Sequence, residues 1–257
     1  MLMGRGGNIA VLTGADGPIL VDDQFEPQVP AILEAVRALQ DAPIRFVINT
    51  HWHADHTGGN EALGRAGALL LAHENVRARL AREQPRPGGG RAPAAPPGAL
   101  PVLTFSERTT LHWNGVTVEV EHVLPAHTDG DSVVWFRERN AVHTGDLYFN
   151  GFYPFIDIAT GGSLDGMIRA VDGLLARVDE NTKIIPGHGP LSNASELRAY
   201  RSMLAAVRDR VGKLVASGRS ADETVAARPT ADFDAEWGDG FLDPETFVRL
   251  IHADLSR

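Results

Sequence analysis

A short stretch of this chain concentrates side chains that can bind a metal ion. His51, His53, Asp55 and His56 lie within six residues of one another. Neutral imidazole and carboxylate groups are good ligands for zinc and similar divalent ions. The preceding residues 44–49 have the apolar pattern of a buried strand, so we expect these side chains on a loop at its carboxyl end. Because alternate side chains of an extended segment point the same way, two of them can reach one metal while the others reach a second.

Three later side chains extend this pattern. His127, Asp146 and His188 each follow a short apolar run, and each has a glycine nearby that allows close approach of backbone and metal. Alone, each residue would be read as part of a turn or as a hydrogen-bonded core residue. Together with the first group they favour a centre for two metal ions. The other histidines are expected on the surface or in the core: His73, His112, His122, His143 and His252.

The elements that must hold these side chains alternate between strands and helices. We expect strands within residues 8–21, 44–49, 68–72, 109–124, 132–144 and 183–186. Helices are expected at residues 29–39, 73–82 and about 163–178, and again after residue 190. This order predicts an α/β (α+β) protein with one domain over residues 1–257. Its core would cover about 1–190 and a helical C-terminal extension about 191–257.

Local signals mark several boundaries within this arrangement. Asn114-Gly115 predicts a tight hairpin turn. Ser163 and Asp243 are predicted helix N-caps, and Ser220 with a glutamate three residues later forms a predicted capping box. The Pro- and Gly-rich residues 85–98 predict a mobile loop and not a domain linker, because strands resume directly after them.

The composition is that of an acidic, cysteine-free protein. The 257 residues carry 24 Lys+Arg against 33 Asp+Glu, a formal net charge of −9, which disfavours nucleic acid and anionic membranes as partners. Without cysteine there are no thiolate zinc sites, iron–sulfur clusters or cysteine nucleophiles. No apolar run reaches the roughly 20 residues of a spanning helix. The sequence as given predicts a cytoplasmic protein, whereas a leader missing from it would direct the protein to the periplasm. The compartment and the oligomeric state therefore stay open.

With these motifs in this order, the chain resembles the metallo-β-lactamase superfamily of metallohydrolases from about residue 8 to about residue 190. The resemblance implies a four-layer αββα sandwich with the metal site at one edge of its sheets. The implied ligands are His51, His53 and His127 for the first metal, Asp55, His56 and His188 for the second, and Asp146 as a bridge between them. Asp22 matches an acidic position that supports the metal loop in this family.

The resemblance also implies a mechanism based on a metal-bound hydroxide. Zinc lowers the pKa of bound water to about 7, so a nucleophile is available at neutral pH. Asp55 would orient this hydroxide while binding the second metal. We expect two Zn²⁺ ions, although a cysteine-free His/Asp site also accepts iron or manganese.

Aromatic residues near the ligands suggest an apolar rim for a small-molecule substrate. Trp52 lies inside the first motif, and the residues that follow Asp146 on one loop are Phe149, Phe152, Tyr153, Phe155 and Ile156. Tyr148 follows Asp146 by two residues, whereas lactonases of the superfamily have a tyrosine three residues after this position.

Several functions fit these residues. The best-known zinc β-lactamases have a cysteine where Asp146 stands, and the surrounding sequence is similar to a branch of β-lactamase-like hydrolases. We therefore expect hydrolysis of a cyclic amide or ester-like small substrate, β-lactams included. The alternatives are a thioester hydrolase of the glyoxalase II type and a mono-iron dioxygenase acting on persulfides. A metal-binding protein without catalytic activity is the remaining possibility, and metal analysis separates the iron enzyme from the others.

Overall fold

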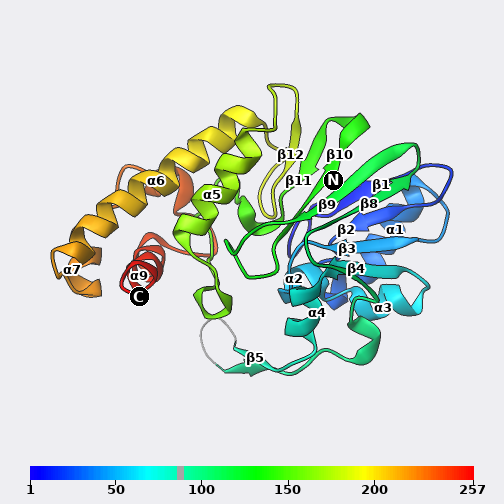
Figure 1. Ribbon diagram of the computed structural model, residues 1–257, viewed down its shortest axis with the longest axis horizontal. Helices are drawn as coiled ribbons and strands as arrows, with labels where there is room; N and C mark the ends of the chain where they lie inside the picture. Colours follow the sequence, from blue (N-terminus) through cyan, green and yellow to red (C-terminus); the bar gives the residue numbers. More distant parts are fainter. Residues whose placement is uncertain (86–89) are drawn as a thin grey trace.

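The computed structural model describes residues 1–85 and 90–257 and contains two five-stranded sheets packed face to face (Figure 1). In sheet order, the first sheet consists of β1 (Ala10–Leu12), β2 (Ile19–Val21), β3 (Phe46–Asn49), β4 (Leu69–His73) and β7 (Leu103–Phe105). The second consists of β12 (Lys183–Ile185), β11 (Ala141–His143), β10 (Ser132–Phe136), β9 (Val116–His122) and β8 (Arg108–Trp113). A two-stranded ladder joins β5 (Gln84–Pro85) to β6 (Arg91–Ala92).

Helices and short 3-10 turns (η) connect and cover these strands. They are η1 (Glu26–Gln28), α1 (Val29–Leu39), α2 (Ala54–Thr57), α3 (Asn60–Arg65), α4 (Glu74–Leu80), η2 (Pro97–Ala99), η3 (Arg137–Arg139), η4 (Gly145–Leu147), η5 (Ile158–Thr160), α5 (Leu164–Leu175), α6 (Ala194–Ala216), α7 (Ala221–Ala226), α8 (Asp234–Trp237) and α9 (Pro244–Leu255). Within the described residues, no helix combines the length and apolar character needed to cross a membrane.

Alternation of buried side chains along the strands accounts for the layers. In β2, Ile19 and Val21 belong to the core between the sheets, whereas Leu20 packs under α1. In β10, Val134 faces the same central core, whereas Val133 and Trp135 pack on the opposite side of the sheet. Because successive side chains of a strand point to opposite faces, each sheet is apolar on both sides and needs a helical layer outside it.

The outer layers are helical on both sides, as the sequence predicts. On the first sheet, Ile32 and Val36 of α1 and Leu63 of α3 form an apolar cluster with the strands. On the second sheet, α5 and α6 contribute Met167, Val171 and Leu204 among others. The fold is therefore the four-layer αββα sandwich, with α5 and α6 on one side of the sheets and α1 and α3 on the other (Figure 1).

The local signals in the sequence are confirmed in most places. Asn114 and Gly115 have positive φ angles of 55° and 68°, which the tight hairpin turn between β8 and β9 requires. Ser163 and Asp243 cap α5 and α9 by accepting backbone hydrogen bonds, and Ser220 forms its capping box with Glu223. In the predicted loop at 85–98, residues 86–89 lie outside the described part of the chain. The remainder contains the β5–β6 ladder and η2.

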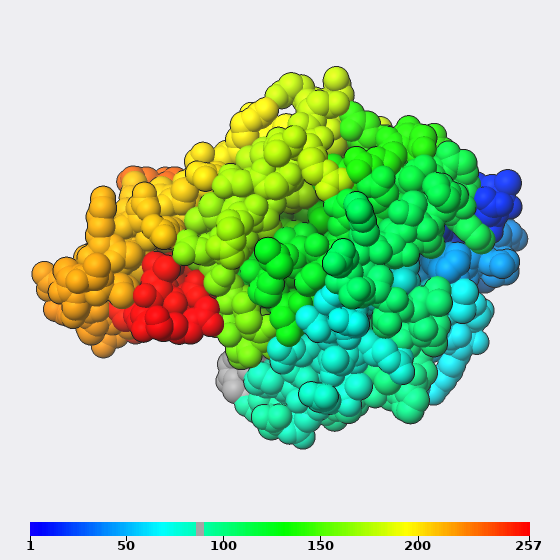
Figure 2. Space-filling model, viewed as in Figure 1, coloured from blue at the N-terminus to red at the C-terminus, as the bar shows by residue number. Residues whose placement is uncertain are grey.

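The C-terminal helices pack into the apolar layer outside the second sheet. α6 makes contacts along α5, and α9 packs against α6 and α7. Phe247 and Ile251 of α9 have no exposed surface and belong to the same apolar cluster as α5 and α6. These helices form an elongated lobe at one end of the molecule (Figure 2). The predicted helical extension is thus continuous with the core through α6.

This packing predicts that Ile251→Ala lowers the free energy of unfolding by about 3 kcal/mol, because a buried branched side chain is lost and a cavity remains. Urea denaturation monitored by circular dichroism measures the change. Leu39→Ala is the control, since Leu39 is 60% exposed, and we expect a change within about 0.5 kcal/mol. Equal effects of the two substitutions would show that α9 is not held by this apolar contact.

Candidate metal centre

Strand directions bring the predicted ligands to one edge of the sandwich. β9, β11 and β12 run in the same direction, because β10 is antiparallel to both β9 and β11, and β11 is parallel to β12. Their carboxyl ends lead into the loops with His127, Asp146 and His188. The end of β3 leads into the loop that starts at His51. Backbone hydrogen bonds join the two sheets here, from Ser132 N to Thr50 O at 2.8 Å among others.

The first group of ligand atoms comes from His51, His53, His127 and Asp146. His53 Nδ1 lies 3.1 Å from His51 Nε2 and 2.9 Å from His127 Nε2. Asp146 Oδ2 lies 3.7 Å from His51 Nε2 and 3.5 Å from His127 Nε2. Three imidazole nitrogens and one carboxylate oxygen therefore converge on one point.

The second group comes from Asp55, His56 and His188, next to the other oxygen of Asp146. Asp146 Oδ1 lies 3.1 Å from His56 Nε2 and 3.5 Å from His188 Nε2. Asp55 Oδ2 lies 3.3 Å from His188 Nε2 and 3.6 Å from His56 Nε2. The two groups thus share Asp146, with one oxygen facing each.

These separations test whether metal ions fit. Zinc bonds to nitrogen and oxygen of about 2.0–2.2 Å in a tetrahedral shell place neighbouring ligand atoms about 3.3 Å apart. The observed separations lie on both sides of this value. Asp146 is 5% exposed, and its buried Oδ1 has no hydrogen-bond partner of proper geometry among the described residues. A buried carboxylate oxygen without a partner is costly unless a cation binds it. The donor set therefore fits two divalent ions.

Hydrogen bonds on the far side of the rings orient two of the histidines, His56 and His127. His56 Nδ1 lies 2.7 Å from Asp22 Oδ2, and Asp22 also accepts hydrogen bonds from the backbone and hydroxyl of Thr50. His127 Nδ1 donates to Phe155 O at 2.8 Å. Such contacts select the ring tautomer and raise the basicity of the ligating nitrogen. Asp22 therefore has the supporting position that the family resemblance implies.

Two further carboxylates support the ligand loops, and the sequence analysis assigned neither. Asp157 Oδ2 lies 3.2 Å from His53 Nε2, although the two residues are 104 positions apart in the chain. Asp131 accepts hydrogen bonds from the backbone N–H groups of His127 and Thr128. Burial raises the pKa of Asp131 to about 7, although these hydrogen bonds favour the charged form. No local motif marks Asp157, because its partner comes from the tertiary fold, whereas Asp131 closes a local turn with residues three and four positions before it.

Electrostatics differ between the two groups. Burial lowers the pKa of His127 to about 4 and lowers the pKa of His51, so both rings are neutral at pH 7. Burial also acts to lower the pKa of His188, but Asp146 and Asp55 outweigh it and raise that pKa to about 9. In the same way, the carboxylates around His56 raise its pKa. The first group is thus ready to bind a cation, whereas the second holds protons that a metal must displace.

Two glycines permit the close packing around the ligands. A Cβ atom on Gly7 would overlap the imidazole ring of His56, and one on Gly187 would overlap Asp146 Oδ1. Both positions therefore require a residue without a side chain. The glycine beside His188 was predicted to have this role, whereas Gly7 entered the sequence analysis only through the family resemblance, without a contact assigned to it.

The predicted substrate-binding aromatics take different positions. The Phe149 ring stacks on His188 with centroids 5.1 Å apart, and Phe152 is half-buried. Trp52 is buried beside the His53 ring, with centroids 4.6 Å apart. Tyr153 is buried and donates a hydrogen bond to Asp234 Oδ1 at 2.9 Å. This bond gives Tyr153 a structural part in joining the loop to α8, and substrate contact by all four residues stays a prediction.

The aromatic rim continues into the C-terminal helices, which the sequence analysis missed. The ring of Phe155 lies 5.9 Å from His53 and 6.1 Å from His127, centroid to centroid. Phe241 packs edge-on against Phe155 at 6.4 Å and is 79% exposed, which makes it the most exposed of the large apolar side chains in the described part of the chain. A glycine-rich surface loop gave no hint of this position.

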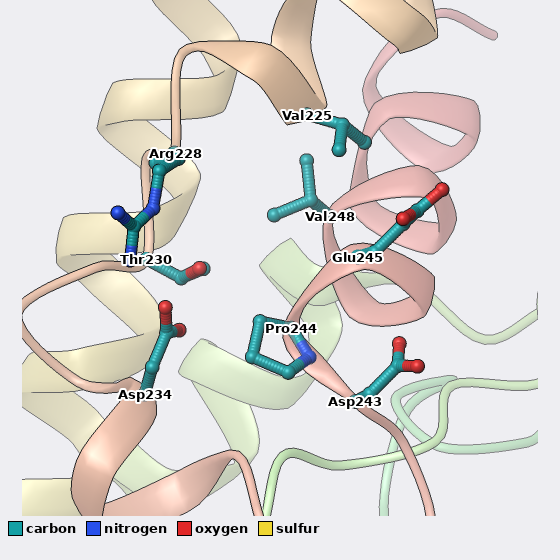
Figure 3. A pocket seen from close by; sticks show the side chains of 8 residues that line it. All are labelled: Val225, Arg228, Thr230, Asp234, Asp243, Pro244, Glu245 and Val248. Carbon is teal, nitrogen blue, oxygen red and sulfur yellow. The ribbon is translucent and has the colours of Figure 1, made fainter.

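A separate pocket lies among the C-terminal helices (Figure 3). Arg228 and Asp234 lie on one side of it, and Pro244, Glu245 and Val248 lie on the other. It contains none of the predicted metal ligands. The chemistry of this protein is therefore assigned to the His/Asp centre and not to this pocket.

Comparison with known proteins agrees with the fold and the ligand set. The family model of the metallo-beta-lactamase superfamily matches residues 2–218. A solved metallo-beta-lactamase from Pontibacter korlensis superposes with a TM-score of 0.64 at 24% identity, covering 77% of this chain and 87% of that one. This similarity concerns the fold alone.

Among curated relatives, a hydroxyacylglutathione hydrolase of Anaeromyxobacter dehalogenans is 28% identical over 182 residues, which cover 70% of this chain and 61% of that protein. The metallo-beta-lactamase type 2 of Bacillus cereus is 23% identical over 187 residues, covering 72% and 68%. The match thus spans about three-fifths of the hydroxyacylglutathione hydrolase. The chain belongs to the metallo-β-lactamase superfamily.

The difference between the two ligand groups predicts different proton release on metal binding. At pH 7, the first Zn²⁺ should enter the group in which His51 and His127 are neutral, and few protons should be released from these two rings. The second Zn²⁺ should displace protons held by His188 and His56. The apparent affinity of the protein for this ion should therefore fall as the pH is lowered below about 9, by about tenfold per pH unit for each proton released. Calorimetric titrations in buffers of different ionisation enthalpy count these protons. Equal release for both ions would contradict the assignment.

Proposed function

We propose that this protein is a dinuclear zinc hydrolase that cleaves the acyl bond of a small ester-like or cyclic amide substrate. One observation carries the proposal: Asp146 presents one carboxylate oxygen to each of two converging ligand groups. When bound there, the two ions would supply a hydroxide nucleophile at neutral pH and polarise the scissile carbonyl. The side chains of the protein would orient the water molecule, bind the substrate and exclude bulk water.

Asp55 is the best-placed residue to orient a water molecule. Burial acts to raise its pKa, but His56 and His188 outweigh this effect and lower the pKa to about 2. Asp55 is therefore an anion at pH 7. Its side chain is 25% exposed, in contrast to the fully buried His56, so it can accept a hydrogen bond from water at the open side of the centre. This supports its predicted role in holding the nucleophile.

The neutral first group suits the binding of a carbonyl oxygen. His51 and His127 are neutral at pH 7, since burial disfavours their charged forms, and the far-side contact of each Nδ1 favours the tautomer with a bare Nε2 facing the centre. Phe155 lies next to His53 and His127, and Phe149 lies next to His188. These rings exclude water from the ligand groups and offer apolar contacts to the organic part of a substrate.

A thioester is the second candidate substrate class. Two of the curated relatives bear the name hydroxyacylglutathione hydrolase, with 28% and 29% identity, and the all-His/Asp ligand set has no cysteine at position 146. Both features support cleavage of a sulfur leaving group. A mono-iron enzyme acting on persulfides would use the same histidine-rich loop, so the metal content of the purified protein is measured first.

The proposal predicts chelator-sensitive hydrolysis that depends on His127. Zinc-loaded protein should cleave chromogenic β-lactam, lactone, aryl ester or thioester substrates, and His127→Ala should lower turnover about a hundredfold or more, because the first ion loses a ligand. His112→Ala on the exposed part of β8 is the matched control and should keep full activity. Protein that holds two zinc ions but cleaves none of these substrates would contradict the proposal.

A second prediction concerns Phe241. We expect its exposed ring to contact the substrate, so Phe241→Ala should raise KM about 10- to 100-fold for substrates with a large apolar acyl group, since about 1.5–3 kcal/mol of burial is lost. The KM for acetyl substrates and the zinc content should not change. Val102→Ala, at a residue that is 64% exposed, is the control. A change in kcat with unchanged KM would show that Phe241 acts on the centre and not on substrate binding.

A further inference from the structure

The segment Asp157–Leu164 joins the two histidine loops of the first ligand group. Its first side chain, Asp157, lies against His53, with Oδ2 3.2 Å from Nε2. Its backbone binds the loop of the other ligand, because Asp157 N donates to His127 O at 2.9 Å and Ser163 N donates to Ala126 O at 2.8 Å. Displacement of this segment would therefore disturb His53 and His127 together.

Asp254, in the last turn of α9, and Arg257, which follows the helix, hold this segment from the C-terminal side. Asp254 Oδ2 accepts a hydrogen bond from Leu164 N at 2.7 Å. Arg257 donates from Nη2 to Gly162 O at 3.0 Å and from Nη1 to Ile158 O at 3.4 Å. Asp254 and Arg257 also form an ion pair, which compensates the charge of the buried Asp254 carboxylate.

The helix α9, which anchors this segment, is itself fixed in place by apolar packing. Phe247 and Ile251, on the buried face of α9, have no exposed surface and pack with α5 and α6. On the opposite side of the segment, Arg79 of α4 forms an ion pair with Asp129 at 2.6 Å and reaches Thr160 O at 3.5 Å. The segment is thus held from two sides, by α9 and by α4.

We propose that Asp254, in the last turn of α9, and Arg257, which follows the helix, form a positioning element of the first ligand group. It holds segment 157–164 so that the Asp157 carboxylate orients His53 and the segment backbone fixes the loop of His127. The match to the superfamily ends at residue 218, so this element lies in the part of the chain beyond it. The inference rests on the proposed metal centre, but not on any particular substrate.

The contact between Asp157 and His53 explains why such an anchor matters. His53 presents Nδ1 to the centre and Nε2 to Asp157. Removal of a carboxylate behind a ligating histidine typically costs about 10- to 100-fold in metal affinity. The ring then loses the partner that sets its tautomer and its orientation. We expect changes at Arg257 to act by the same route, with a smaller effect because the segment keeps its contacts with Arg79.

Zinc affinity, measured by competition with a chromogenic chelator, tests the proposal without any substrate. Asp157→Ala should weaken zinc binding at the first ligand group, which we expect to be the tighter site, about 10- to 100-fold. Asp157→Asn should keep part of the affinity because its amide oxygen can still accept a hydrogen bond from His53. Arg257→Ala should weaken the same site about 3- to 10-fold, a share of that loss. Arg257→Lys should restore part of it, since it keeps the positive charge beside Asp254.

Arg249→Ala is the matched control on the same helix. Arg249 forms exposed ion pairs with Asp222 and Glu245 and has no contact with segment 157–164 among its recorded ion pairs and hydrogen bonds. It should leave zinc affinity unchanged. Urea unfolding of the metal-free proteins shows whether each variant is folded, and the visible spectrum of Co²⁺-loaded protein reports the geometry of the first site.

The outcomes separate this inference from the proposed function. Altered Co²⁺ spectra and weaker zinc binding in folded Asp157→Ala and Arg257→Ala, with an unchanged Arg249→Ala, would support the positioning role. Wild-type affinity and spectrum in folded Arg257→Ala would overturn it, as would equal losses in Arg249→Ala and Arg257→Ala. Protein that binds zinc in this way but hydrolyses no acyl substrate would refute the proposed function and leave the positioning role supported.

Discussion

The structure depends on a buried carboxylate shared by two groups of ligands. Asp146 is almost without exposed surface, and burial alone would raise its pKa and favour the neutral form. Nearby histidines, His56 and His188 above all, outweigh burial and lower that pKa. An ionised carboxylate in this position is stable only while positive partners surround it. The placement of His56 and His188 beside Asp146 is therefore an electrostatic necessity as well as part of the metal-binding arrangement.

The sandwich supplies the rigidity that this arrangement needs. The ligands come from four loops in two sheets, so their separations depend on how the sheets pack. The apolar core between the sheets, with Ile48 on one side and Val134 and Ile185 on the other, sets their distance. Hydrogen bonds such as Asn8 N to Gly187 O at 2.7 Å join the loops directly at the edge. Close packing of this kind leaves no room for a Cβ atom beside the ligands, which is why Gly7 and Gly187 are required there.

The C-terminal helices belong to the functional unit in two ways. They bring an exposed aromatic ring, Phe241, next to Phe155, and they hold segment 157–164 through α9. Both features come from residues that follow the metal-binding motifs in the sequence. Under the proposed function, the ligand set would carry the chemistry, while Phe241 and the end of α9 would influence the entrance and the support of the first ligand group.

The sequence by itself determined the features that act over short distances. The ligand types, the spacing of His51 and His53, the Asn114-Gly115 turn and the helix caps depend on neighbouring residues, so local patterns predicted them. The family resemblance added the pairing of distant ligands. Only the tertiary structure decided which nitrogen each histidine presents, since the choice depends on partners such as Asp157, which is 104 residues from His53. It also placed Tyr153 in the packed layer and Phe241 at the rim, because burial is a property of the assembled helices and not of the residue type.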